Sequence, residues 1–103
     1  MSLIKWSEEG GQVRLGLPGD LDLPMAQPLL DSLRHALSAG GDVAVLAEGV
    51  ERVSTASVQA LLVASRAAAE AGVRFVILRP SEVLVETCDD LGLASWLNRW
   101  SQS

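Results

Sequence analysis

Hydrophobic and polar positions form short segments along the chain, and their spacing predicts the secondary structure. Two extended segments come first, at Leu3–Trp6 and Val13–Leu17, on either side of the polar stretch Glu8–Gly11. The two glycines of that stretch can adopt the positive φ angles that a tight hairpin turn requires. We therefore expect the chain to open with two antiparallel strands.

The next segment is predicted to be a helix that ends at Gly40 and Gly41. Asp22 stands in the position of an N-cap, and Pro24 follows in the first turn, where proline is well tolerated. The leucines that recur at helical spacing are Leu29, Leu30, Leu33 and Leu37.

The middle of the chain predicts a strand, a helix and a second strand. Asp42–Ala47 is a short apolar run typical of a buried strand, and Val50–Val53 is extended after a turn at Gly49. A helix is expected from Ala56 to Ala71, closed by a glycine, and a buried strand over Val73–Leu78. One stripe of that helix carries Val58, Leu61, Leu62 and Ser65.

The last part of the chain predicts two short helices. Ser81 is placed as an N-cap with Glu82 in the first turn, and Gly92 ends this helix. Its shared face is expected to hold Leu84, Cys88 and Leu91. A final turn or short helix carries Leu93, Trp96, Leu97 and Trp100 before a polar tail.

The element order is therefore β-β-α-β-α-β-α-α, within one domain that spans residues 1–103. Strands that flank a helix are most simply parallel, whereas the opening hairpin adds an antiparallel edge. The predicted fold is an α/β domain with a small mixed β-sheet, covered mainly on one face by helices.

Composition restricts the class of protein. With 49% hydrophobic and 20% charged residues, the chain is typical of a folded domain rather than a disordered or fibrous one. Its net charge of −5 disfavours binding to nucleic acid and to anionic membranes, because both attract positive charge. No apolar run approaches the roughly 18 residues of a membrane span, and Met1–Leu3 lacks the features of a signal peptide. We expect a cytoplasmic protein without direct membrane insertion.

Cysteine and histidine each occur once. Cys88 alone cannot form an internal disulfide, and with His35 it cannot supply a zinc cluster. We expect no metal and no cofactor. His35 is interpreted as a surface residue of the first helix, and Cys88 as a small buried thiol on the apolar face of the third.

Three hydroxyls mark the start of the second helix, at Ser54, Thr55 and Ser57. They lie where the unpaired N–H groups and the positive end of the helix dipole favour a capping oxygen or a phosphate. Capping by Ser54 or Thr55, with the other hydroxyls solvated, is favoured over a modification site on physical grounds alone.

Several motifs together resemble the STAS domain family, which includes bacterial anti-sigma-factor antagonists. The resemblance extends over about residues 13–97. It implies a small α/β domain that binds protein partners through the surface around the N-terminus of its second helix. The motifs are Leu17–Asp22, Glu48–Val58, Pro80-Ser81 and Leu91–Leu93.

The antagonists carry an Asp-Ser-Ser-Gly-Leu-type motif, in which a partner kinase phosphorylates the second serine. Aligned on that motif, Ser54 replaces the aspartate, Thr55 matches the first hydroxyl, Ala56 occupies the acceptor position and Ser57 replaces the glycine. Alanine cannot take a phosphate, so the resemblance leaves only Thr55 or Ser57 as substitutes for the acceptor.

The resemblance implies a non-enzymatic regulatory module that antagonises an anti-sigma factor or another kinase-like protein. Two alternatives remain open. A threonine kept beside a lost acceptor is similar to the STAS accessory subunit of the phospholipid-trafficking ABC transporter of Gram-negative bacteria, which binds an ATPase subunit. STAS proteins associated with chemotaxis operons also depart from the serine motif. A small enzyme is disfavoured, because no catalytic constellation assembles from these residues.

The resemblance also places Asp20 and Asp22 in a loop near the same surface. They could act as a general acid/base pair, but no nucleophile, basic partner or phosphate cradle accompanies them. Helix capping and solvation are the preferred interpretation, and partner contact is the second. The predicted partner surface therefore comprises Asp20, Asp22, Ser54, Thr55 and Ser57.

The tryptophans allow two interpretations. Trp96 and Trp100 are one helical turn apart, which suits either an interface or a terminal helix that folds back on the sheet. We favour packing over partner binding. Trp6, on an edge strand, is equally open to both.

Overall fold

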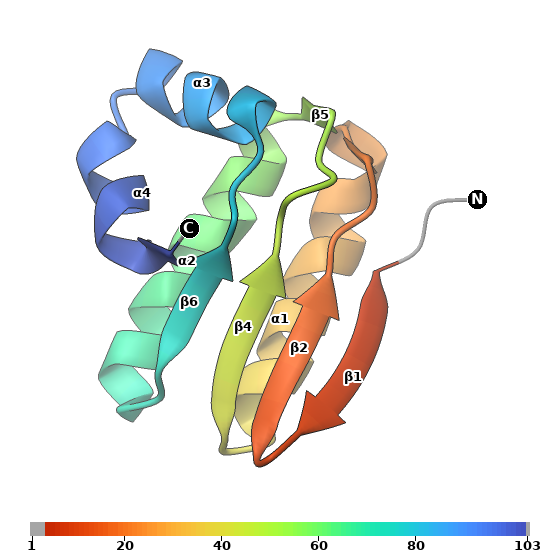
Figure 1. Ribbon diagram of the computed structural model, residues 1–103, viewed down its shortest axis with the longest axis vertical. Helices are drawn as coiled ribbons and strands as arrows, with labels where there is room; N and C mark the ends of the chain where they lie inside the picture. The colour runs from red at the N-terminus through yellow and green to blue at the C-terminus, as the bar shows by residue number, and fades with distance from the viewer. Residues whose placement is uncertain (1–3, 103) are drawn as a thin grey trace.

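In the computed structural model, which describes residues 4–102, the chain opens with a hairpin of β1 (Lys5–Glu9) and β2 (Gln12–Gly16) (Figure 1). Gly10 and Gly11 have φ angles of 56° and 81°, the left-handed region that the two-residue turn requires. The hairpin is confirmed, but β1 begins and ends later than predicted. Leu3, the expected start of β1, lies outside the described residues.

The first helix begins differently from the prediction. A short 3₁₀ turn, η1 (Leu23–Met25), precedes α1 (Ala26–Ser38), and the Asp22 side chain makes no capping hydrogen bond. Asp22 is instead held by its backbone, because its N–H donates to Oδ1 of Asp20 at 3.2 Å and its carbonyl accepts from the N–H of Met25 at 2.9 Å. The predicted position is confirmed, because Asp22 is the N-cap residue of η1 with Pro24 in its first turn, but the expected capping by its side chain is wrong and α1 itself begins only after the 3₁₀ turn.

The main sheet has the order β1-β2-β4-β6-β7. Only β1 is antiparallel to its neighbour, while β4 (Asp42–Leu46), β6 (Phe75–Leu78) and β7 (Ser101–Gln102) run parallel with β2. Strand β6 is shorter than predicted. The polar C-terminal tail was not expected to be a strand, yet β7 pairs with β6, and the Arg79 N–H donates to the carbonyl of Gln102 at 2.7 Å.

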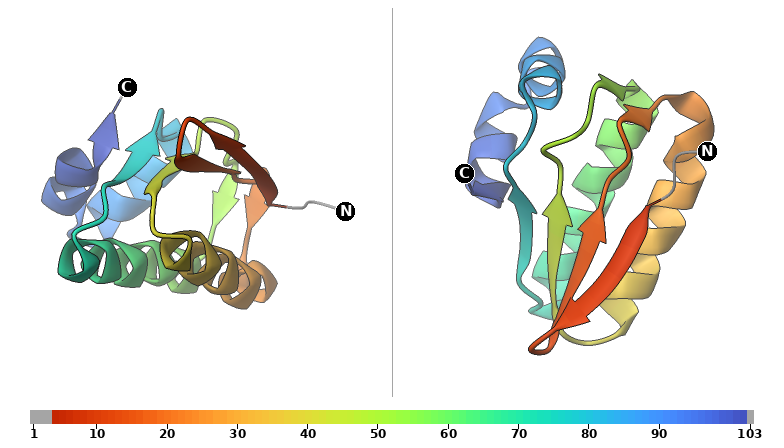
Figure 2. Two further views of the ribbon diagram at one scale, coloured as in Figure 1. Left: turned by 90° about the horizontal axis from the view of Figure 1, so that it is seen from below. Right: turned by 45° about the vertical axis from the view of Figure 1, so that its right-hand side comes forward.

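Helices α1 and α2 (Thr55–Ala71) lie side by side on one face of the sheet (Figure 2). The inward side chains of the strands and both helices form the core, so the predicted α/β class with a mixed sheet is confirmed. The expected stripe of α2 holds for Val58, Leu61 and Ser65, whereas Leu62 is only half-buried. The largest fully buried side chains include Leu15, Leu29, Leu33, Val45, Leu61 and Ile77.

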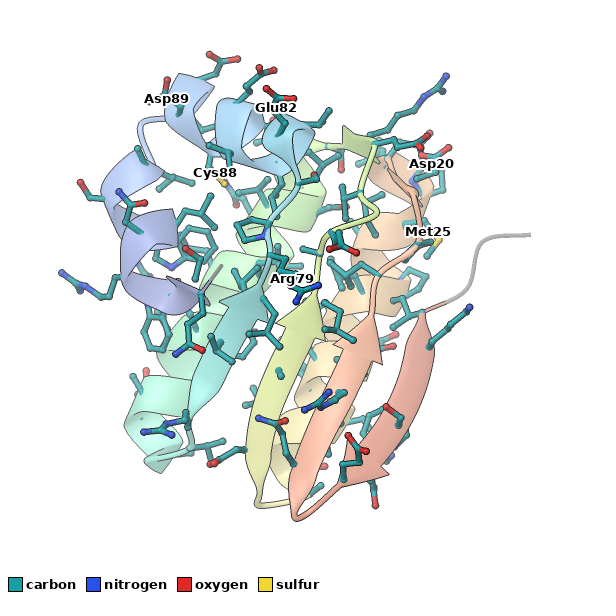
Figure 3. The ribbon with its side chains drawn as sticks, viewed as in Figure 1. Asp20, Met25, Arg79, Glu82, Cys88 and Asp89 are labelled. Carbon is teal, nitrogen blue, oxygen red and sulfur yellow. The ribbon has the colours of Figure 1, made fainter. Side chains whose placement is uncertain are left out.

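Helices α3 (Glu82–Asp90) and α4 (Ala94–Trp100) connect β6 to β7. The predicted cap of α3 is confirmed, because Oγ of Ser81 accepts from the N–H of Leu84 at 3.2 Å. Cys88 is buried and points inward (Figure 3). Leu91 is 39% exposed and leaves the expected apolar face, because it forms the C-cap of the helix.

The preferred packing of the terminal tryptophans is confirmed. Trp96 and Trp100 are half-buried against the core, and the rings of Trp100 and Phe75 pack in an edge-type arrangement with their centroids 6.0 Å apart. At the opposite edge of the sheet, Trp6 is exposed and its ring lies 5.1 Å from that of His35 on α1.

None of the helices within residues 4–102 is long and apolar enough to cross a membrane.

Candidate functional site

The N-terminus of α2 is capped by a single hydroxyl. Ser54 has extended backbone angles, with φ −88° and ψ 159°, and its Oγ accepts from the N–H of Ser57 at 3.1 Å. This is the geometry in which a serine satisfies one of the unpaired N–H groups at a helix start. Of the two predicted capping residues, Ser54 fills the role.

Ser57 is fully buried, so the expectation that the hydroxyls other than the cap are solvated is wrong at this position. Its Oγ donates to the carbonyl of Leu21 at 2.8 Å and accepts from Oγ of Ser54 at 3.1 Å. The hydroxyl faces inward because it ties the first turn of α2 to β3 (Asp20–Leu21). Folded protein therefore offers no free Ser57 hydroxyl at its surface.

Thr55 and Ala56 occupy the outer side of the same turn. Thr55 is exposed, and Ala56 is half-buried. Of the three predicted hydroxyls, Thr55 is thus the one that stands on the surface. Ala56 contributes a methyl group, which can take part in an apolar contact but carries no group that accepts a phosphate.

A small parallel pair of strands, β3 and β5 (Arg52–Val53), holds the preceding loop against this turn. The carbonyl of Gly19 accepts from the N–H groups of Glu51 and Arg52 at 2.7 and 2.9 Å, and the Ser54 N–H donates to the carbonyl of Leu21 at 2.9 Å. A Cβ at position 19 would lie 3.4 Å from the carbonyl oxygen of Gly49, so the two loop segments are in van der Waals contact here. The backbone around the helix start is therefore well connected.

The same strands place the two predicted carboxylates at this end of the molecule. Asp20 lies on β3, paired in register with Arg52, and Asp22 follows as an exposed residue before η1. Asp20 and Met25 appear at the end where β3 meets the start of α1 (Figure 3). Neither carboxylate caps a helix, so both remain candidates for partner contact.

A groove of about 230 Å³ runs between α1 and α2 beside the helix start. Among its lining residues, Val63 is 44% exposed, and Leu23 of the preceding 3₁₀ turn is 69% exposed. This groove was not predicted from the sequence. Two features of the sequence could have indicated it: the apolar Leu23 in the polar segment before α1, and Val63, which does not belong to the buried stripe of α2. The groove is lined by Ala26, Gln27, Leu30, Ala56, Gln59, Ala60 and Val63.

The chemistry of this end of the molecule suits contact with another surface. It combines the Thr55 hydroxyl, the Asp20 and Asp22 carboxylates and an apolar groove on a backbone that is held in place by hydrogen bonds.

Burial raises the pKa of the Cys88 thiol, so this buried group stays protonated at neutral pH. Among the described residues, no group of three or more His, Cys, Asp or Glu could hold a metal ion.

Comparison with known proteins gives a family and a fold. The model of the family described as "Mlab, STAS domain" matches residues 4–98. A solved structure of the anti-sigma factor antagonist SpoIIAA in its unphosphorylated form is similar, with a TM-score of 0.78 and 17% identity over 97% of this chain and 86% of that one. The phosphorylated form of SpoIIAA, a cell fate determinant of Bacillus, gives a TM-score of 0.76 and 17% identity over 97% and 89%. No curated protein sequence matches the chain.

Proposed function

Because the chain belongs to the STAS domain family, we propose that it is a regulatory module without enzymatic activity that binds a protein partner. The partner is an anti-sigma factor or a related kinase-like protein, and the chain acts as its antagonist in the cytoplasm. The fold shared with SpoIIAA, an anti-sigma factor antagonist, supports this choice. The contact surface is the N-terminus of α2 with the neighbouring Asp20 and Asp22.

The observation that carries the proposal is the position of Thr55. This exposed hydroxyl stands beside Ala56, which lines the groove between α1 and α2. Beneath it, Ser54 and Ser57 are fully engaged in hydrogen bonds that fix the first turn of the helix. A polar group on a rigid support beside an apolar groove provides specificity and buried area in one place.

The proposed module binds without a phosphate switch at position 56. Alanine at that position has no acceptor, and the Ser57 hydroxyl is buried. Thr55 is the remaining candidate for phosphorylation in this turn. A phosphate there would place about −1.5 to −2 charges at a helix N-terminus, where the dipole favours them.

A second candidate function is an accessory subunit bound to the ATPase subunit of a phospholipid-trafficking ABC transporter. Two observations favour it. Thr55 is kept while the acceptor is replaced by Ala56, and the description of the matching family includes the word Mlab. This function uses the same surface, so it differs from the first in the partner and not in the site. A chemotaxis-associated STAS protein would share the departure from the serine motif as well.

The test is a quantitative pull-down from the native organism with two matched variants. Thr55→Arg places a long cation on the proposed surface, whereas Ala67→Arg places the same side chain at another exposed position of α2. The two positions are 12 residues apart, or about 18 Å along the helix. Mass spectrometry of the captured proteins distinguishes a kinase-like anti-sigma factor, a transporter ATPase and a chemotaxis protein.

We expect the Ala67→Arg variant to retain the partner of the parent protein and Thr55→Arg to lose it, with both variants folded by circular dichroism. Equal retention by both variants would place the contact surface elsewhere. If the parent protein captures an enzyme's substrate instead of a protein partner, or captures no protein at all, the proposed protein-binding function is contradicted.

A further inference from the structure

Strand β1 leaves its outer edge free among the described residues. It ends the order β1-β2-β4-β6-β7, it pairs only with β2, and all five of its side chains are exposed. Free N–H and C=O groups on such an edge can pair with another strand. Natural edges are often protected from pairing by charged residues, and β1 carries Lys5, Glu8 and Glu9.

The hairpin turn determines which backbone groups point outward. Glu9 and Gln12 flank a two-residue turn, so they form the hydrogen-bonded pair that closes the hairpin. Hydrogen-bonded and non-hydrogen-bonded pairs alternate along antiparallel strands, so Lys5 and Ser7 also direct their backbone groups towards β2. Trp6 and Glu8 therefore direct theirs to the free edge.

We propose that a second copy of this chain pairs with this edge, so that two β1 strands run antiparallel and join two sheets into one. The register is centred on Ser7. It places Trp6 opposite Glu8 of the other copy, and these are the residues whose backbone groups point outward. The pairing is isologous, as a two-fold symmetric dimer requires.

The charges of β1 fit this register. Lys5 faces Glu9 of the other copy twice, once on each side of the two-fold axis, and the exposed Glu9 carboxylate also lies 3.6 Å from Arg14 of its own chain. Cross-strand neighbours of opposite charge attract, whereas like charges directly opposite each other repel. Moving the register by two residues in one direction would set Glu8 against Glu8. Moving it in the other direction would set Lys5 against Ser7 and lose both ion pairs, and would set Trp6 against Trp6 instead.

The proposed dimer goes beyond the proposed function, because it uses a different part of the molecule. Lys5–Glu9 form one lateral edge of the sheet, whereas Thr55 and the groove belong to the start of α2 (Figure 1). Each copy would keep its partner surface, so the dimer is bivalent. Loss of partner binding and loss of dimerisation can therefore be measured independently.

The first test is disulfide cross-linking of the full chain under mild oxidation. In the proposed register, Ser7 faces Ser7 in a non-hydrogen-bonded pair, with Cα atoms about 4.5 Å apart, within the range of a disulfide. We expect Ser7→Cys to form a covalent dimer rapidly and the equally exposed Glu9→Cys to form it slowly, since Glu9 faces Lys5. Cys88 is buried and serves as an internal control. Faster cross-linking of Glu9→Cys would overturn the register.

The second test is charge reversal, followed by sedimentation equilibrium from micromolar to millimolar concentration. Lys5→Glu should weaken dimerisation on the order of tenfold, and Lys5→Glu with Glu9→Lys should restore it. Arg74→Glu is the matched control, because it changes net charge equally at an exposed position before β6. A parent protein that stays monomeric up to millimolar concentration, or a dimer that Lys5→Glu leaves intact, would overturn the proposal.

Discussion

The indole Nε1–H of Trp96 donates a hydrogen bond to Oγ of Ser65 at 3.0 Å, and this bond joins α4 to the middle of α2. Oγ of Ser65 in turn donates to the carbonyl of Leu62 at 2.7 Å. The C-terminal helix is therefore attached to the helix whose first turn forms the candidate site. Because Trp96 is already engaged within the domain, the structure gives it a stabilising role.

Replacement of Ser65 by alanine should destabilise the fold. The Trp96 indole would lose its acceptor in a half-buried position, which costs about 0.5–1.5 kcal/mol for a hydrogen bond of this type. Chemical denaturation of Ser65→Ala, Trp96→Phe and the double variant measures the coupling directly. Additive effects of the two single variants would contradict a hydrogen bond that contributes to stability.

Truncation before Ala94 should lower the melting temperature strongly. It removes α4 with its buried Leu97 and the two half-buried indoles, and buried apolar area contributes about 25 cal/mol per Å². A shorter truncation after Trp100 removes only the β7 segment and is the matched control. If both truncated proteins melt at the temperature of the full chain, α4 is a docking element rather than part of the core.

Acidic substitutions at two hydroxyls of the first turn of α2 should have opposite effects. Thr55→Glu adds an exposed negative charge at the helix N-terminus and should stabilise the fold by about 0.3–1 kcal/mol. Ser57→Glu introduces a charge into a fully buried site and should unfold the domain or destabilise it by several kcal/mol. Thermal melts of both variants test the assignment of Thr55 as the exposed hydroxyl. Similar melting temperatures would show that Ser57 is accessible.

Above neutral pH, the Cys88 thiol should make stability depend on pH. Burial raises its pKa in the folded state, so folded protein holds the thiol proton more tightly than unfolded protein does. This contribution is fully present below the unfolded pKa of about 8.5 and is lost as pH rises towards the higher folded value. The chain has no tyrosine, so few other groups titrate in this range. Denaturation between pH 7 and 10 should therefore show a falling stability that is weaker in Cys88→Ala.

Local signals predicted most of the fold. The glycine pair at the hairpin, the serine cap of α3 and the glycines after α1 and α2 identify where elements begin and end. Two of the three two-residue strands, β3 and β7, were missed because they carry no apolar alternation of their own, whereas β5 lies within the predicted extended segment Val50–Val53. They form only where β5 and β6 present free edges, which is a property of the tertiary structure.

The candidate site was predicted only in part. The motif located the helix start, but hydrophilic residue type does not distinguish the exposed Thr55 from the buried Ser57. That difference depends on the carbonyl of Leu21, which lies 36 residues earlier in the chain. The Asp22 side chain likewise fails as a cap because the helix is entered through a 3₁₀ turn. The groove between α1 and α2 arises from two helices and has no single sequence motif.

The most direct test of the proposed binding surface is a nuclear magnetic resonance titration of the isotopically labelled chain with the partner recovered by pull-down. We predict that the amide signals that shift or broaden most belong to Asp20, Asp22, Thr55, Ala56 and Gln59. Those of α4 and of the β6–β7 edge should stay in place. Changes centred on Trp96 and Trp100, with the start of α2 unaffected, would contradict the account.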